Sequence, residues 1–411
     1  MLANDKARFK QYLSVTGCYW AFTLTDGALR MLVVLYFHQL GYSPFEVATL
    51  FLLYEFFGVV TNLFGARLAA QFGLNMTLKA GLALQIVALA MLLLPASLLT
   101  VPYVMAAQAL SGIAKDLNKM SAKSSMKALV PEDQQGKLYR WVAVLTGSKN
   151  TLKGIGFFLG GALLAGLGFQ GAVGSMAAGL LLVLIAAQCV LREDPASVRF
   201  KPKFRDLLSK SPRINILSGA RFFLFGARDI WFVVALPVFV QSNLNWSHVE
   251  VGSFLAVWVI LYGLVQTRAP ALTRSAIAAS HQQGRLAATW AIPLVVVCAA
   301  LAMVQFNASL NSTVLISALL LFGALFAINS SLHSYLIVSY SQADQVALDV
   351  GFYYMANAAG RLVGTLLSGL LYQLYGLGVC LIASATFIFL AAFLVKRLDH
   401  HTSMQVGLRA D

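Results

Sequence analysis

The chain has 411 residues, of which 59% are hydrophobic and only 11% are charged, and its mean hydropathy is +0.75. Soluble domains carry about 25% charged residues, so this composition excludes a soluble protein or a soluble enzyme. The net charge of +14 is typical of basic residues that flank membrane spans, and we do not expect nucleic acid to be a partner.

Apolar runs of about 20 residues, enough to cross a lipid bilayer as a helix, recur along the whole chain. The first run follows a basic N-terminus and is too long for a cleavable signal core. Twelve spans are predicted, at 12–39, 45–66, 75–94, 102–122, 139–166, 170–190, 214–241, 248–266, 286–305, 313–340, 346–375 and 377–395.

Lysine and arginine set the orientation, because positive residues stay on the cytoplasmic side. The connections at 40–44, 95–101, 167–169, 242–247, 306–312 and 376 contain neither residue. The tails and nearly all of the alternate connections are basic, apart from a neutral loop at 341–345. We therefore expect a multi-pass protein with an even number of spans and both termini in the cytoplasm.

The longest basic loop, at 192–213, divides the predicted spans six and six. It predicts an N-terminal six-helix bundle at 1–191, a cytoplasmic linker at 192–213, and a C-terminal six-helix bundle with a cytoplasmic tail at 214–411. A weak internal repeat supports this division, because Leu40–Val47 resembles Leu244–Val251. Parallel repeats of this kind occur in large secondary-transporter folds.

Once the basic residues of the cytoplasmic segments are set aside, eight cations remain within the predicted spans, and five acids accompany them. The cations are Arg30, Lys115, Lys119, Lys149, Lys153, Arg221, Arg228 and Arg361, and the acids are Asp26, Glu55, Asp116, Asp229 and Asp349. An ionised side chain near the bilayer centre costs at least about 2.5–3.5 kcal/mol, so such residues need a partner, water or a substrate. The excess of cations predicts an anionic substrate, bound by the cations, with the acids in coupling or ion-pair roles.

The fourth and fifth spans carry the densest cations. Lys115, Lys119, Lys123 and Lys127 repeat every four residues, and like charges at this spacing destabilise a helix. The outer two are equally well explained as orientation signals, so the inner two are the better binding candidates. In the next span, Lys149, Asn150 and Lys153 supply cationic and amide donors suited to a phosphate-like oxyanion.

The acids leave alternatives open. Asp26 and Arg30 lie four residues apart, so they either pair on one helix face or serve the substrate. Arg228 and Asp229 are adjacent and point in different directions, so we expect each to pair with another helix. The driving force also stays open between proton antiport and the membrane potential.

No catalytic or cofactor site is predicted. The sequence contains no nucleophile–base arrangement, no metal-ligand spacing and no phosphate-binding glycine loop. The cysteines, Cys18, Cys189, Cys298 and Cys380, lie singly in separate spans and are interpreted as packing residues. We expect neither enzymatic activity nor a cofactor.

Four stretches carry a specific resemblance, at Ala21–Arg30, Ser111–Ser121, Thr146–Asn150 and Ala220–Asp229. They are similar to the organoarsenical efflux permeases of the ArsJ type, in the major facilitator superfamily. The charged Asp-Arg pair that this superfamily usually carries after the second span is missing at 65–73.

The resemblance implies an all-α membrane protein with the major facilitator fold, twelve transmembrane helices and alternating access. It also implies a monomer in the bacterial inner membrane that exports 1-arseno-3-phosphoglycerate and thereby confers arsenate resistance. A glyceraldehyde-3-phosphate dehydrogenase that accepts arsenate in place of phosphate makes this ester. Two alternatives remain at this stage, namely a facilitator for another phosphate ester or organic anion, and a membrane sensor or channel.

Overall fold

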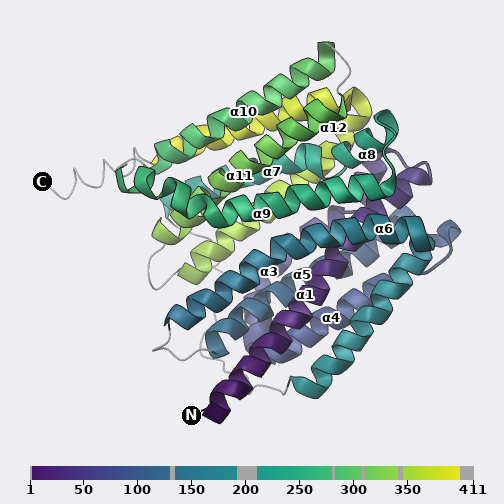
Figure 1. Cartoon of the computed structure of the whole chain (residues 1–411), viewed down its shortest axis with the longest axis vertical. Coiled ribbons are helices and arrows are strands. Elements are labelled where there is room, and N and C mark those ends of the chain that lie inside the picture. The colour runs from purple at the N-terminus through teal and green to yellow at the C-terminus, as the bar shows by residue number, and fades with distance from the viewer. Residues whose placement is uncertain are drawn as a thin grey trace, which may run out of the picture. The chain divides into compact units, whose positions relative to one another are not determined.

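The computed structural model describes residues 2–129, 135–191, 211–279, 283–307, 311–340 and 346–398 (Figure 1). The described residues form helices and no strand. The helices are α1 (Leu2–Gln39), α2 (Pro44–Thr49), α3 (Leu52–Phe72), α4 (Leu74–Met91), η1 (Ala96–Leu98), α5 (Val101–Leu129), α6 (Gln135–Val190), α7 (Pro212–Phe232), α8 (Ala235–Asn243), α9 (His248–Ala279), α10 (Gln283–Asn307), α11 (Ser312–Tyr340) and α12 (Val346–Lys396).

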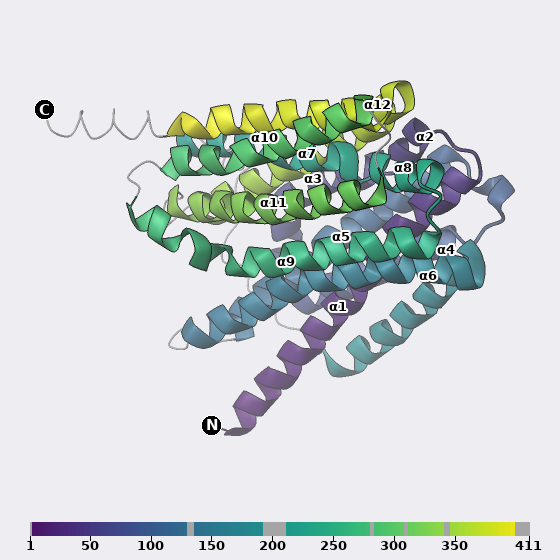
Figure 2. The same cartoon turned by 45° about the horizontal axis from the view of Figure 1, so that its top comes forward.

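The helices pack as two compact units. The first unit takes in the described residues of 1–39, 53–202 and 247–257, and the second those of 40–52, 203–246 and 258–411. Each unit thus includes a short segment from the other half of the sequence. Within the second unit, α10, α11 and α12 run side by side (Figure 2). The predicted boundaries at 191 and 214 stay a prediction, because residues 192–210 of the linker and the tail at 399–411 lie outside the described residues.

Nine helices in the described part of the chain are long and apolar enough to cross a membrane, by length and composition alone. Two of these stretches, at Ser148–Val190 and Asp349–Lys396, are 43 and 48 residues long, which suffices for two crossings each. Helix α5, which carries several lysines, is not apolar enough to be counted among these nine. The total of twelve spans therefore stays a prediction.

The two longest helices are each interrupted by a glycine. Gly168 in α6 has a φ of 68° and Gly376 in α12 a φ of 77°, in the region of backbone conformation that favours glycine. The chain reverses direction at Gly168, as the course of α6 shows (Figure 1). Both interruptions coincide with the predicted connections at 167–169 and 376, so the prediction that a helix is interrupted at each place is confirmed.

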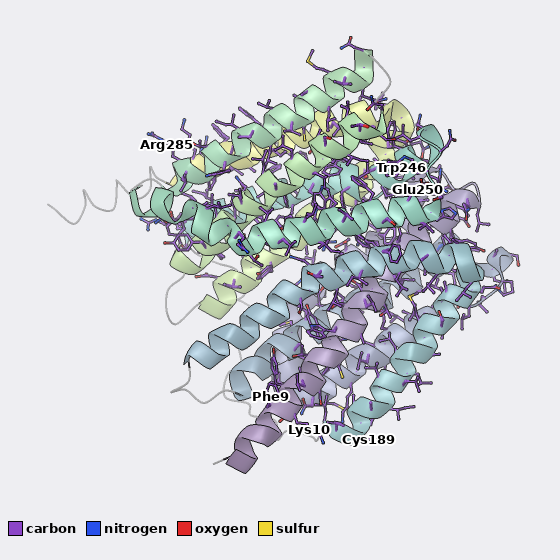
Figure 3. All side chains as sticks on the ribbon, in the orientation of Figure 1. Phe9, Lys10, Cys189, Trp246, Glu250 and Arg285 are labelled. Carbon is purple, nitrogen blue, oxygen red and sulfur yellow. The ribbon has the colours of Figure 1, made fainter. Side chains whose placement is uncertain are left out.

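The internal repeat of the sequence corresponds to two equivalent helix starts. Ser43 and Glu46 form a capping box at α2, in which each side chain bonds the backbone N–H of the other residue. Ser247 and Glu250 form the same arrangement at α9, near Trp246 (Figure 3). The backbone N–H of Ser43 lies 2.8 Å from the Glu46 carboxylate, and that of Ser247 lies 2.7 Å from Glu250.

Several helices extend beyond the apolar runs into segments predicted as loops. Helix α5 continues to Leu129, and α9 continues to Ala279. The apolar pattern marks only the lipid-facing part of a helix, whereas lysine, arginine and glutamine continue it into water at little cost. Lys79 lies inside α4 and is buried. Its Nζ donates to the Leu191 carbonyl oxygen at 2.8 Å, next to the C-terminus of α6.

Candidate functional site

In the first unit, Tyr54 of α3 contacts an acidic and a basic side chain. Its hydroxyl donates to Asp26 of α1 at 2.6 Å, and the Nζ of Lys115 lies 4.0 Å from the centre of its ring. The neighbouring Glu55, fully buried, accepts from Arg30 at 2.5 Å. Arg30 thus pairs across helices with Glu55, while Asp26 accepts from a tyrosine. The predicted alternative in which Asp26 and Arg30 form an ion pair on one helix face is therefore wrong.

Asp116 of α5 lies between two lysines of the same helix, and we call these three residues the Asp116 cluster. The Nζ of Lys119 lies 2.5 Å from one carboxylate oxygen, and that of Lys115 lies 3.8 Å from the other. Lys119 also donates to the Asn62 side chain of α3 at 2.7 Å. Asp116 is fully buried, whereas both lysine side chains are 20% exposed. The lysines therefore keep some access to water or to a ligand.

Helix α6 carries the remaining predicted donors of this unit, and all three are partly buried. Lys149, Asn150 and Lys153 lie just before a close contact between α6 and α1. A Cβ atom added to Gly27 would lie 2.8 Å from the Lys153 carbonyl oxygen, which leaves room only for glycine there. The Lys153 Nζ lies 5.6 Å from the centre of the Phe157 ring. The side chains of Lys123 and Lys127 lie outside the described residues.

In the second unit, Asp229 of α7 holds two arginines, and we call these three residues the Asp229 cluster. Arg228 donates to one carboxylate oxygen through Nε at 2.7 Å and Nη2 at 2.5 Å. Arg361 of α12 donates to the other oxygen through Nε at 3.0 Å. Asp229 is fully buried, and the arginine side chains are 15% and 17% exposed. The prediction of a partner on another helix is confirmed for Asp229 and wrong for Arg228, which pairs with its neighbour.

Arg221, two turns before Arg228 on α7, has a different environment. It is 4% exposed, and its Nη1 donates at 3.2 Å to the carbonyl and hydroxyl oxygens of Ser330 on α11. Its guanidinium carbon lies 3.8 Å from the centre of the Phe225 ring. Among the described residues it has no carboxylate partner, and its Nε makes no hydrogen bond. A buried guanidinium with only neutral partners is costly, and an anion would offset that cost.

The repeat extends to the packing around these arginines. Gly156 and Gly160 of α6 face the carbonyl groups of Leu24 and Ala28. In the same way, Gly360 and Gly364 of α12 face the carbonyl groups of Phe222 and Gly226. Arg30 follows Ala28 by two residues, and Arg228 follows Gly226 by two. The two arginines therefore occupy equivalent positions, although their carboxylate partners differ.

Asp349, predicted in a coupling or ion-pair role, lies in the first turn of α12 and is 5% exposed. No ion pair joins it to another described residue. Sequence reasoning missed Tyr54, Asn62 and Ser330 as partners of the charges. The position of Tyr54 beside Glu55 in the sequence was the only signal available for any of them. No group of three metal-ligating side chains occurs in the part of the chain that the structure describes.

A comparison with known protein families matches residues 15–341 to the Major Facilitator Superfamily. The chain belongs to this superfamily. It is therefore a multi-pass secondary transporter of a small substrate in a lipid bilayer and not an enzyme, and the predicted fold class is confirmed. A comparison with curated proteins finds no match. The family does not identify the substrate.

Proposed function

We propose that this transporter exports a small organic polyanion, and that the substrate is 1-arseno-3-phosphoglycerate. The observation that carries the proposal is the excess of cations among the charges of the membrane-spanning helices. The Asp116 and Asp229 clusters each hold two cations on a single carboxylate. Arg221 adds a buried guanidinium without a carboxylate among its described neighbours. An anionic substrate would balance this charge during its passage.

The nature of the donors favours a phosphate-like group over trivalent arsenic. Lysine and arginine bind oxyanions through charge-assisted hydrogen bonds, whereas trivalent arsenic requires clustered thiolates. The four cysteines are free thiols, with Cys18, Cys298 and Cys380 buried and Cys189 exposed at the end of α6 (Figure 3), and the described residues hold no group of three metal-ligating side chains. The four stretches that resemble organoarsenical efflux permeases also contain most of these cations. We propose export across the bacterial inner membrane by a monomer with both termini in the cytoplasm.

The function can be tested in an arsenic-sensitive host that expresses the chain with or without an arsenate-accepting glyceraldehyde-3-phosphate dehydrogenase. We expect protection against arsenate only when the dehydrogenase is present, and no protection against arsenite. A variant with both Lys149→Ala and Lys153→Ala should lose protection at a similar abundance in the membrane. Protection against arsenite, or against arsenate in a host that cannot form the ester, would leave an unspecified anion facilitator as the function.

A further inference from the structure

Helix α7 carries two arginines on one face, on either side of a phenylalanine. Arg221 and Arg228 are seven residues apart, which places them two turns apart with a rise of about 10 Å. Their guanidinium carbons lie 3.8 Å and 5.1 Å from the centre of the Phe225 ring. The two cations are therefore at most about 9 Å apart, and both lie within cation–π distance of the same ring.

Asp229 holds the Arg228 guanidinium in place, but the guanidinium still has N–H groups available for a second acceptor. Its Nε and Nη2 both bond Asp229, and no described residue accepts from its Nη1. Arg361 bonds the opposite oxygen of the same carboxylate. A guanidinium has five N–H donors in a planar fork, so Arg228 can hold Asp229 and still donate to a second oxyanion. This end of the α7 face is partly exposed.

The Arg221 guanidinium occupies a drier, neutral environment with further unsatisfied polar atoms. Its Nε has no partner among the described residues, and the same holds for the Nδ1 of His333. His333 follows Ser330 by three residues on α11, which places both on one face of that helix, and it is 1% exposed. The Ser330 hydroxyl accepts from Arg221 and lies 3.4 Å from the Tyr262 hydroxyl. A guanidinium nitrogen and an imidazole nitrogen without a described protein partner can each contact a bound oxyanion.

We propose that the second unit binds a substrate with an oxyanion at each end, one at Arg221 and His333 and the other at Arg228 and Arg361. The inference rests on the proposed function and specifies how the two ends of the substrate are recognised. The phosphorus and arsenic atoms of the ester are separated by six bonds, or about 7 Å when extended, since three bonds span 3.8 Å in a peptide. This length lies within the upper limit of about 9 Å on the separation of the two guanidinium groups. A substrate with one oxyanion fills only one of the two ends.

The test is equilibrium binding to the purified full chain in lipid nanodiscs, with two stable probes. One probe, 3-phosphoglycerate, is anionic at both ends, and the other, glycerol 3-phosphate, at one end only. We expect the first to bind the wild type at least about tenfold more tightly, as charge-assisted bidentate contacts allow. Arg221→Gln should weaken 3-phosphoglycerate by about tenfold and change glycerol 3-phosphate by less than about twofold. Arg285→Gln, which removes an exposed cation of α10, is the matched control and should change neither (Figure 3).

Two further variants keep the test decisive if Arg221→Gln fails to fold. Arg221→Lys preserves the charge but not the planar fork, and His333→Asn removes only the ring, so each should lower the preference for the two-ended probe. An unchanged preference in all folded variants would overturn the inference. If arsenic uptake into inverted vesicles depends on the dehydrogenase while this preference is absent, the proposed function stands and the two-ended site is wrong. If neither probe binds and no uptake occurs, both proposals are wrong.

Discussion

Each unit contains a buried carboxylate whose negative charge is balanced by cations, but the cations differ in kind between the units. In each, one fully buried carboxylate holds two partly exposed cations, but the cations are lysines at Asp116 and arginines at Asp229. A lysine is a strongly hydrated point charge on a flexible chain, whereas an arginine is a planar fork fixed by its hydrogen bonds. The Asp116 cluster also lies within one helix, while the Asp229 cluster joins α7 to α12. The lysines of the Asp116 cluster can therefore change position. The Asp229 cluster fixes both the geometry of its arginines and the packing of two helices.

Removing the two carboxylates should have the largest effect on stability and should show how far the two clusters differ. Asp229→Asn leaves two arginines without their shared partner and should lower the free energy of unfolding by about 3 kcal/mol, with loss of transport. Asp116→Asn should cost about half as much, because flexible lysines reach water more easily. The thermal midpoints of the two purified variants in one detergent provide the measurement. Equal losses would show that the choice of lysine or arginine is irrelevant to stability.

The close helix contacts test whether the units share their packing as well as their charges. Gly360→Ala would place a methyl group against the Phe222 carbonyl oxygen, and Gly156→Ala would place one 2.5 Å from that of Leu24. Each should destabilise its unit by about 1–3 kcal/mol. Gly179→Ala is the control, since nothing lies within 4 Å of the added atom. A wild-type melting temperature for Gly360→Ala would mean that α7 and α12 can separate at little cost.

A charge-preserving substitution should separate geometry from charge. Arg228→Lys cannot reproduce the two bonds to one carboxylate oxygen and should lower transport about tenfold at normal membrane abundance. Lys127→Ala, on the outer part of the lysine series, should change transport by less than about twofold. Uptake into inverted vesicles measures both variants. Similar effects would indicate that only bulk positive charge matters.

The sequence was sufficient to predict the helical fold and the glycine interruptions of α6 and α12. It could not predict most of the pairing. Arg228 and Asp229 point apart at the Cβ atom, yet the long arginine side chain returns to its neighbour. Arg30 is four residues from Asp26, but it pairs with Glu55 of α3 instead. Pairing depends on side-chain length, rotamer and the neighbouring helix, and a single sequence reports none of these for residues far apart.

The smallest expected effect concerns the two equivalent helix starts, where the units should behave alike. Ser43 and Ser247 each accept at 3.3 Å from the backbone N–H of the glutamate three residues later. Replacing either serine by alanine should cost about 0.5–2 kcal/mol of stability, as is typical for the loss of an N-cap. The glutamate's bond to the Ser43 or Ser247 backbone N–H survives in each variant, so the loss should fall at the low end of that range.

The comparison between Ser43→Ala and Ser247→Ala is more informative than either value. Residues 40–52 pack in the second unit, although they follow α1 of the first, and residues 247–257 pack in the first. If both starts serve only their own helices, the two variants should lower the melting temperature by the same small amount and leave transport unchanged. A loss of transport in one variant alone would show that its helix start has acquired a role in the transport cycle that its counterpart lacks. The repeat would then be structural in one unit and functional in the other.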